Sequence, residues 1–177
     1  MTFNYKNVYV GDTVTVAGVY EKNGPLKKYF DKTYNDLYFG EDSWEKAEIK
    51  AIKDNLALMS KKLGKKNSKV DLVIGADLLN QISASTYGCL GYGEAFIGVY
   101  GACSSSVLEM IIASNFIDSG QIENAIALVS SHNMTSEKQF RNPTEYGAPK
   151  PNSATFTATG SASIYLTNKK TDVRVEC

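Results

Sequence analysis

The sequence contains little of what disulfide frameworks and metal sites require. Its 177 residues include one histidine and three cysteines. Cys89, Cys103 and Cys177 are odd in number and lie far apart, which argues against a disulfide framework and against a structural zinc site. One histidine with dispersed carboxylates does not supply the converging ligands that a metal centre needs. We therefore expect no metal, no cofactor and a reducing compartment.

Two further absences limit the partners. The 19 Lys and Arg residues balance the 19 Asp and Glu residues without forming a basic stripe, so we expect no nucleic-acid partner. No apolar run approaches the roughly 20 residues that span a bilayer, and the first residues, MTFNYKN, lack the apolar stretch of a signal peptide. We expect no transmembrane segment, and any association with a membrane would have to be peripheral.

Apolar runs and helical patterns alternate along the chain. Patterns typical of strands occupy the second half of 8–20, then 71–76, 96–100, 125–130 and 155–166. Helical patterns cover 42–64 and the residues from 104 to Gly120. A chain of this length suits one ordinary domain. The alternation predicts an α/β fold with a mixed, mostly parallel β-sheet.

The clearest helix is predicted to begin at Asp42, which resembles the N-cap of a capping box with Glu45, and to stop at Gly64. The stripe that should face the core recurs at a spacing of three to four residues. It consists of Trp44, Glu48, Ile52, Leu56, Met59 and Leu63. Every member is apolar except Glu48.

The stretch 96–118, FIGVYGACSSSVLEMIIASNFID, is predicted to form a covered strand, a tight elbow and a buried central helix. Apolar residues surround most of this helix, which indicates that protein encloses it on nearly all sides. Cys103 lies at the elbow, where unpaired N–H groups and the positive end of the helix dipole favour a thiolate. The alternative is a buried cysteine that acts only as a small apolar side chain.

Three polar clusters each follow a predicted strand, at 77–81, 103–106 and 131–133. Because ligands bind beyond the carboxyl ends of strands in α/β sheets, the clusters predict a pocket there. His132 either contacts a ligand or Cys103, or is a loop histidine with a satisfied hydrogen bond; a Cys–His dyad within this chain is the less expected case. Arg141 and Arg174 could hold a carboxylate, although a surface role is the stronger expectation for each.

The segment 26–42 has no clear period and is rich in aromatic residues. It is either a flap or subunit contact, since long irregular segments are often functional, or a loop that packs on its own domain.

Several stretches resemble the stage V sporulation protein AD family of the thiolase superfamily. They are GPLKKYFDKTYNDLYFGEDSWEKAE at 24–48, DLLNQ at 77–81, GVYGACSSS at 98–106 and SSHNMTSEKQFRNPTEYGAPKPNSATFTATGSA at 130–162. The order of the elements is similar to the N-terminal half of a thiolase-like protein, in which a nucleophilic cysteine begins the buried central helix. Cys103 matches that position, whereas the catalytic histidines of thiolases belong to the other half and are missing here.

The resemblance implies a thiolase-like domain at 1–170, with the start of a second half at 171–177. It also implies a homodimeric sporulation protein that takes part in spore germination, peripheral to the forespore or spore inner membrane. Family members look like binders of dipicolinic acid, in a channel assembly with other spore membrane proteins, more than like enzymes. We expect the ligand to contact Cys103, Ser104, His132, Asn133 and Asn80.

Two alternatives to this binder remain. One is an acyl-transferring condensing enzyme, of the ketoacyl synthase or thiolase type, that uses Cys103 as its nucleophile. The other is a structural scaffold whose pocket is vestigial.

Overall fold

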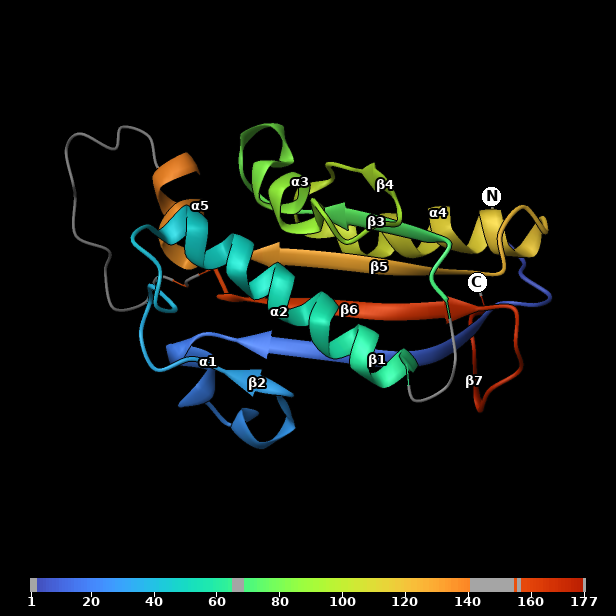
Figure 1. Ribbon diagram of the computed structural model, residues 1–177, viewed down its shortest axis with the longest axis horizontal. Helices are drawn as coiled ribbons and strands as arrows, with labels where there is room; N and C mark the ends of the chain where they lie inside the picture. The colour runs from blue at the N-terminus through green and yellow to red at the C-terminus, as the bar shows by residue number, and fades with distance from the viewer. Residues whose placement is uncertain (1–2, 65–68, 141–154, 156, 177) are drawn as a thin grey trace.

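A computed structural model describes residues 3–64, 69–140, 155 and 157–176 of the chain (Figure 1). Its strands are β1 (Tyr9–Ala17), β2 (Lys32–Thr33), β3 (Leu72–Ala76), β4 (Ala95–Gly98), β5 (Asn124–Ser131), β6 (Gly160–Thr167) and β7 (Val173–Arg174). Its α-helices are α1 (Val19–Lys22), α2 (Trp44–Gly64), α3 (Ser83–Cys89), α4 (Ser105–Asp118) and α5 (Asn133–Phe140). Three short 3₁₀ segments are η1 (Lys27–Tyr29), η2 (Asn80–Ile82) and η3 (Ala102–Ser104).

One mixed sheet organises the described residues. Its strand order is β2-β1-β6-β5-β3-β4, and β7 also pairs with β1. The pairs β1–β2, β3–β4 and β3–β5 are parallel, whereas β6 runs antiparallel to both β1 and β5, and β7 runs antiparallel to β1. The predicted α/β class with a mixed sheet is confirmed. Whether 171–177 begins a second half stays a prediction; here β7 extends the same sheet.

Helix α2 covers one face of the sheet together with α3 (Figure 1). Its predicted stripe is buried from Glu48 to Leu63, whereas Trp44, the first predicted member, is only partly buried. Gly88 of α3 permits a close approach, because a Cβ there would come within 2.5 Å of Ile52. The predicted cap is shifted by one residue: the Lys46 N–H donates to Ser43 Oγ at 3.2 Å, whereas Asp42 pairs with Lys46 Nζ.

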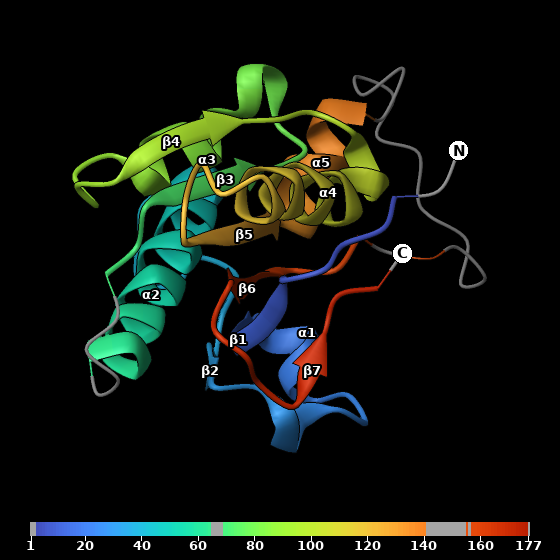
Figure 2. The ribbon, with the colours of Figure 1, turned by 90° about the vertical axis from the view of Figure 1, so that its right-hand side faces the viewer.

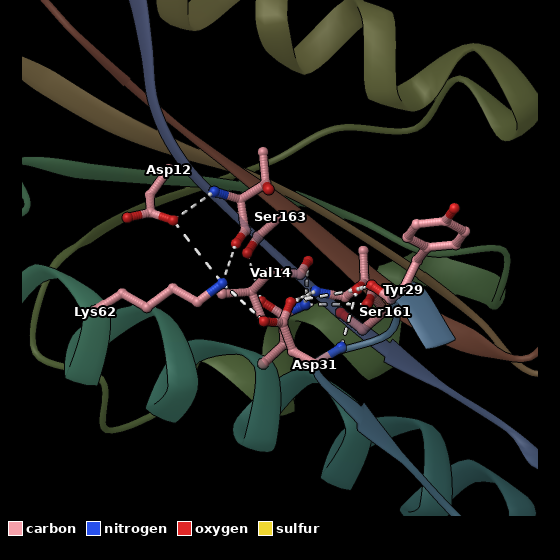
Figure 3. Close-up of polar contacts among 10 residues, drawn as sticks. Asp12, Val14, Tyr29, Asp31, Lys62, Ser161 and Ser163 are labelled. Carbon is pink, nitrogen blue, oxygen red and sulfur yellow. Dashed lines mark hydrogen bonds and ion pairs between the residues drawn. The ribbon is translucent and has the colours of Figure 1, made fainter. Parts of the chain in front are cut away.

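Polar side chains fasten the second half of α2 to the sheet (Figure 3). Asn55 is fully buried and donates to the carbonyls of Val14 and Ser161, while its own carbonyl accepts from Ser163. Lys62 Nζ donates to the Thr13 carbonyl at 2.7 Å and to Asp31 Oδ1 at 2.8 Å. Every polar atom named here has a partner, so this attachment is complete within the chain.

Helix α4 covers the opposite face of the sheet, as the end-on view shows (Figure 2). The prediction that protein encloses it on nearly all sides is wrong for this chain. Only one stripe is buried, and Val107 on another side is 59% exposed. The prediction of a covered strand before it is also wrong, because β4 lies at one edge of the sheet and is only partly buried. Within 3–64, 69–140 and 157–176, no further layer of protein covers these apolar surfaces.

The aromatic segment divides into two parts. Phe39 is buried, stacks on Tyr34 with ring centroids 3.8 Å apart and lies 5.7 Å from the His132 ring. Leu26 and Tyr29 are exposed. Tyr34 and Phe39 therefore pack on their own domain, and residues 26–29 project from it. Along the described part of the chain, no helix combines the length and apolar character that crossing a bilayer requires.

Candidate functional site

A cavity of about 350 Å³ lies at the carboxyl ends of β3 and β5. Residues from β1, α1, the start of α4 and the segment 157–162 also line it, together with Phe30. Asp77, Cys103 and Ser131 all line it, so one residue from each of the three predicted clusters meets there. A volume of several hundred Å³ is typical of sites for small molecules.

Cys103 is exposed and lines the cavity just before the first turn of α4. The preceding Ala102 has a φ of +46°, a left-handed conformation that costs energy for a residue with a Cβ. The Gly101 N–H donates to Ser105 Oγ at 3.1 Å, and Ser104 Oγ donates back to the Gly101 carbonyl at 2.7 Å. These bonds fix the elbow that presents the thiol to the cavity. The exposure of Cys103 in this chain argues against the alternative of a buried cysteine.

Asp77 faces the cavity from the end of β3 and is almost completely buried. Its Oδ1 accepts from the Leu79 N–H at 2.8 Å, and its Oδ2 accepts from the Ser85 N–H at 2.6 Å. Both oxygens thereby hold the turn that leads into α3. Asn80, the residue of this cluster that was predicted to bind ligand, is exposed and does not line the cavity.

His132 and Asn133 are buried beside the cavity but are not part of its described lining. The Met134 N–H donates to His132 Nδ1 at 3.2 Å, so Nε2 carries the proton and donates to the Leu37 carbonyl at 2.8 Å. Burial lowers the pKa of His132 and favours its neutral form. The histidine thus has satisfied hydrogen bonds and connects β5 to the aromatic segment.

Glu21 was not predicted, and it lines the cavity from α1. Its Oε1 accepts from the Thr159 N–H at 2.9 Å, while Oε2 is buried without a hydrogen-bond partner. No sequence pattern marks Glu21, because its partner lies 138 residues away.

The described lining is acidic. It contains Glu21 and Asp77 but no lysine, arginine or histidine. Arg174 pairs with Glu176 on β7, and Arg141 lies outside the described residues. Among the residues that the structure describes, no cluster of His, Cys, Asp and Glu could hold a metal ion. Of the five predicted ligand contacts, the structure therefore places Cys103 alone on the cavity wall.

Comparison with known proteins identifies the family. A family model described as Stage V sporulation protein AD (SpoVAD) matches residues 1–177. The chain belongs to this family. Stage V sporulation protein AD of Bacillus subtilis (strain 168) is 40% identical to this SpoVAD chain over 170 residues, which are 95% of the chain and 50% of that protein. The chain thus spans about half the length of this curated relative.

Solved structures show the fold that this SpoVAD chain shares. The 3-oxoacyl-(acyl carrier protein) synthase III of Pseudomonas aeruginosa PAO1 matches 94% of the chain and 53% of its own, with a TM-score of 0.58 and 9% identity. The peroxisomal 3-ketoacyl-CoA thiolase of Saccharomyces cerevisiae matches 92% of the chain and 60% of its own, with a TM-score of 0.55 and 14% identity. That thiolase is described as five layers built from two core domains of identical topology. The predicted thiolase-like fold is confirmed.

Proposed function

We propose that this chain forms a ligand-binding half of a sporulation protein that binds dipicolinic acid. The ligand would sit in the cavity at the start of α4. The protein would act at the forespore or spore inner membrane, in a channel assembly that takes up or releases the compound. The observation that carries the proposal is this cavity, which lies beside an exposed cysteine in a SpoVAD chain.

Two features of the cavity favour a small planar carboxylate ligand: the N-terminus of α4 and the hydroxyl groups of the wall. A helix N-terminus offers free N–H groups and a positive dipole end, and both favour an anion. Ser106, Ser131 and Thr157 add hydroxyl-bearing residues to the wall.

The two acidic residues of the lining oppose a dianion unless they are neutralised. Asp77 is bonded to two N–H groups, but Glu21 has one oxygen without a partner. Tight binding would therefore require a cationic group from outside the described lining, supplied by the rest of the protein.

Calorimetry of the full-length protein with dipicolinate tests the proposal. We expect saturable binding in the wild type and its loss in Ser106→Phe, which fills the cavity from its wall. Val107→Ala, next in the chain but outside the described lining, is the matched control and should bind normally. Absence of binding to the wild type with Cys103 intact would refute the proposal.

Acyl transfer by Cys103 is the second candidate. It is favoured by the exposed thiol beside a cavity, in a fold shared with a 3-oxoacyl synthase. It is weakened by the position of His132, whose two ring nitrogens are already bonded. Mass spectrometry after exposure to acyl-coenzyme A decides: an acyl adduct on Cys103 supports this function, and an unmodified Cys103 excludes it.

Homodimer formation through β4 is part of the proposal. Along the described residues β4 pairs only with β3, which leaves one edge of backbone N–H and C=O groups open. Leu90, which is 73% exposed, and the exposed Tyr87 and Tyr100 lie in the segments that flank this strand. Light scattering of the full-length protein should give the mass of a dimer. Ile97→Pro, in the middle of β4, should shift that mass toward the monomer.

A further inference from the structure

Glu48 is the polar member of the core-facing stripe of α2, and only 1% of its surface is exposed. Ser130 Oγ, at the end of β5, donates to Glu48 Oε1 at 3.0 Å. Thr135 Oγ1, in the first turn of α5, lies 2.8 Å from Glu48 Oε2. No ion pair joins Glu48 to any lysine or arginine within 3–64, 69–140 or 157–176. The carboxyl group is thus held by two hydroxyls.

The Thr135 hydroxyl has two acceptors within reach. Its Oγ1 lies 2.8 Å from Glu48 Oε2 and 2.9 Å from the His132 carbonyl oxygen. A hydroxyl carries one proton, so it cannot donate fully to both. If Glu48 is ionised, one contact is left unmade. If Glu48 is protonated, its own O–H donates to Thr135, Thr135 donates to the His132 carbonyl, and every contact is made.

The charges that face Glu48 also favour the protonated form. Asp77 at the end of β3 and Glu45 on α2 are the charged groups that act on it, and both are acidic. Lys138 of α5 is paired with Glu45 at 3.0 Å. Burial is the main cause that raises the pKa of Glu48, to about 7, against the hydrogen bonds from Thr135 and Ser130 that lower it.

The segment that Glu48 holds is connected to the cavity wall. Ser130, one of its two partners, lines the cavity. Asn133, two residues before Thr135, donates its N–H to Thr159 Oγ1 at 2.9 Å and accepts from the same hydroxyl at 2.8 Å. Thr159 lines the cavity, and its N–H donates to Glu21 Oε1. A change at Glu48 therefore reaches the wall directly at Ser130, and at Thr159 through the backbone that links Thr135 to Asn133.

We infer that Glu48 is a positioning residue that works in its protonated form: it donates to Thr135, accepts from Ser130, and so holds residues 130–135 in place beside the cavity. Deprotonation removes one bond of this chain and places a negative charge among acidic neighbours. Residues 130–135 are then less firmly held, and ligand binding becomes dependent on pH. The link to ligand binding rests on the proposed function, whereas the protonation of Glu48 does not.

The protonated carboxyl can be observed directly in the full-length protein. Infrared difference spectra at pH 6 compare the wild type with Glu48→Gln and with the control Glu45→Gln. We expect the C=O band of one protonated carboxylic acid to disappear in Glu48→Gln and to persist in Glu45→Gln. Equal intensity of this band in the wild type and Glu48→Gln would overturn the inference.

The pH profile separates a positioning role from simple packing. If only the protonated form is competent, the dipicolinate affinity of the wild type should fall about tenfold from pH 6 to pH 8, in proportion to the protonated fraction. Glutamine supplies the same donor and acceptor as protonated glutamate, so Glu48→Gln should remove this dependence. Glu48→Leu, which supplies neither, should lower the unfolding midpoint at every pH.

Two results would contradict the inference. One is a wild-type pH profile that Glu48→Gln leaves unchanged, and the other is an unfolding midpoint for Glu48→Gln as low as that of Glu48→Leu. If no variant binds dipicolinate, the proposed function fails. The infrared band and the pH dependence of unfolding still decide the role of Glu48.

Discussion

The two faces of the sheet differ in how far the chain completes them. On the α2 face, Ile52, Leu56 and Met59 are fully buried, and the buried Asn55 has partners for its polar atoms. On the α4 face, Met110, Ile112 and Phe116 are only partly buried. Both carboxyl oxygens of Glu109 are buried there without a hydrogen-bond partner.

The difference indicates which face of the sheet we expect other protein to cover. Buried polar groups are almost always hydrogen-bonded, and large apolar patches are rarely left open in soluble monomers. The apolar core under α2 is closed, although Trp44 Nε1 of α2 and Ser85 Oγ of α3 are buried without a hydrogen-bond partner. Under α4, the described residues leave apolar side chains partly open and also leave both carboxyl oxygens of Glu109 without a partner. Since the chain spans half of its curated relative, we expect the remaining half to cover α4.

The largest effect should come from truncation on the completed face. Leu56→Ala removes a buried side chain from a closed core and should lower the free energy of unfolding by about 3 kcal/mol. Ile112→Ala on α4 should cost less than about 1.5 kcal/mol in the 177-residue chain, because Ile112 is only partly buried there. Chemical denaturation of both variants measures the difference. Equal losses of unfolding free energy in the two variants would show that the two faces are equally well packed.

The same two variants, measured in the full-length protein, test whether other protein covers α4. If the second half covers α4, the cost of Ile112→Ala should rise toward that of Leu56→Ala. An unchanged cost would mean that α4 stays uncovered.

A smaller effect is expected from Glu109. Burial raises the pKa of its carboxyl to about 9. The nearby Leu128 backbone lowers this pKa, but it offsets only part of the rise because no well-formed hydrogen bond joins it to Glu109. Because the native state holds a proton that the unfolded state releases, stability falls as pH rises from 4.5, the ordinary pKa, through about 9. Glu109→Gln should remove up to about 1.4 kcal/mol of this loss per pH unit.

Denaturant titrations between pH 7 and pH 9 measure that slope. Glu48 adds little to this slope, because its stabilising contribution is lost as pH rises through about 7, and of the two carboxyls only Glu109 still titrates near pH 9. A steep slope that persists in Glu109→Gln would refute the assignment. In the full-length protein, a partner for Glu109 from the other half should flatten the wild-type slope as well.

The smallest effect should come from Lys62. Its ion pair with Asp31 is about one-third exposed on each side. Burial raises the pKa of Asp31, but its hydrogen bonds with Lys62 and Thr15 outweigh this and lower the pKa overall. Exposed pairs contribute little, so Lys62→Met should cost less than about 1 kcal/mol, and less still in high salt. A loss comparable to that of Leu56→Ala would show that packing does not dominate the α2 face.

The sequence predicted the elements of the fold better than their surroundings. The period of 42–64 defines α2 almost to the residue, because that pattern is local. The apolar runs at 96–100 and around α4 could not reveal whether a neighbour covers them. A strand whose edge pairs with another protein chain has the same apolar pattern as a central strand. The pattern alone therefore does not tell the two apart.

The sequence predicted only those site residues that lie at or shortly after the end of a strand. Asp77, Cys103 and Ser131 meet because strand ends converge at one edge of the sheet. Asn80 is only three residues beyond Asp77, but the turn exposes it. Glu21 depends on Thr159, a contact between distant parts of the chain that no local pattern encodes.

Protection of Cys103 tests the central claim most directly. Cys103 is exposed at the cavity wall and Cys89 is buried, so an alkylating reagent followed by peptide mass mapping reports on Cys103 in the full-length protein. We predict that saturating dipicolinate slows alkylation of Cys103, because the ligand occupies the cavity beside the thiol. Dipicolinate that binds without changing the alkylation rate would place the ligand elsewhere and contradict the account.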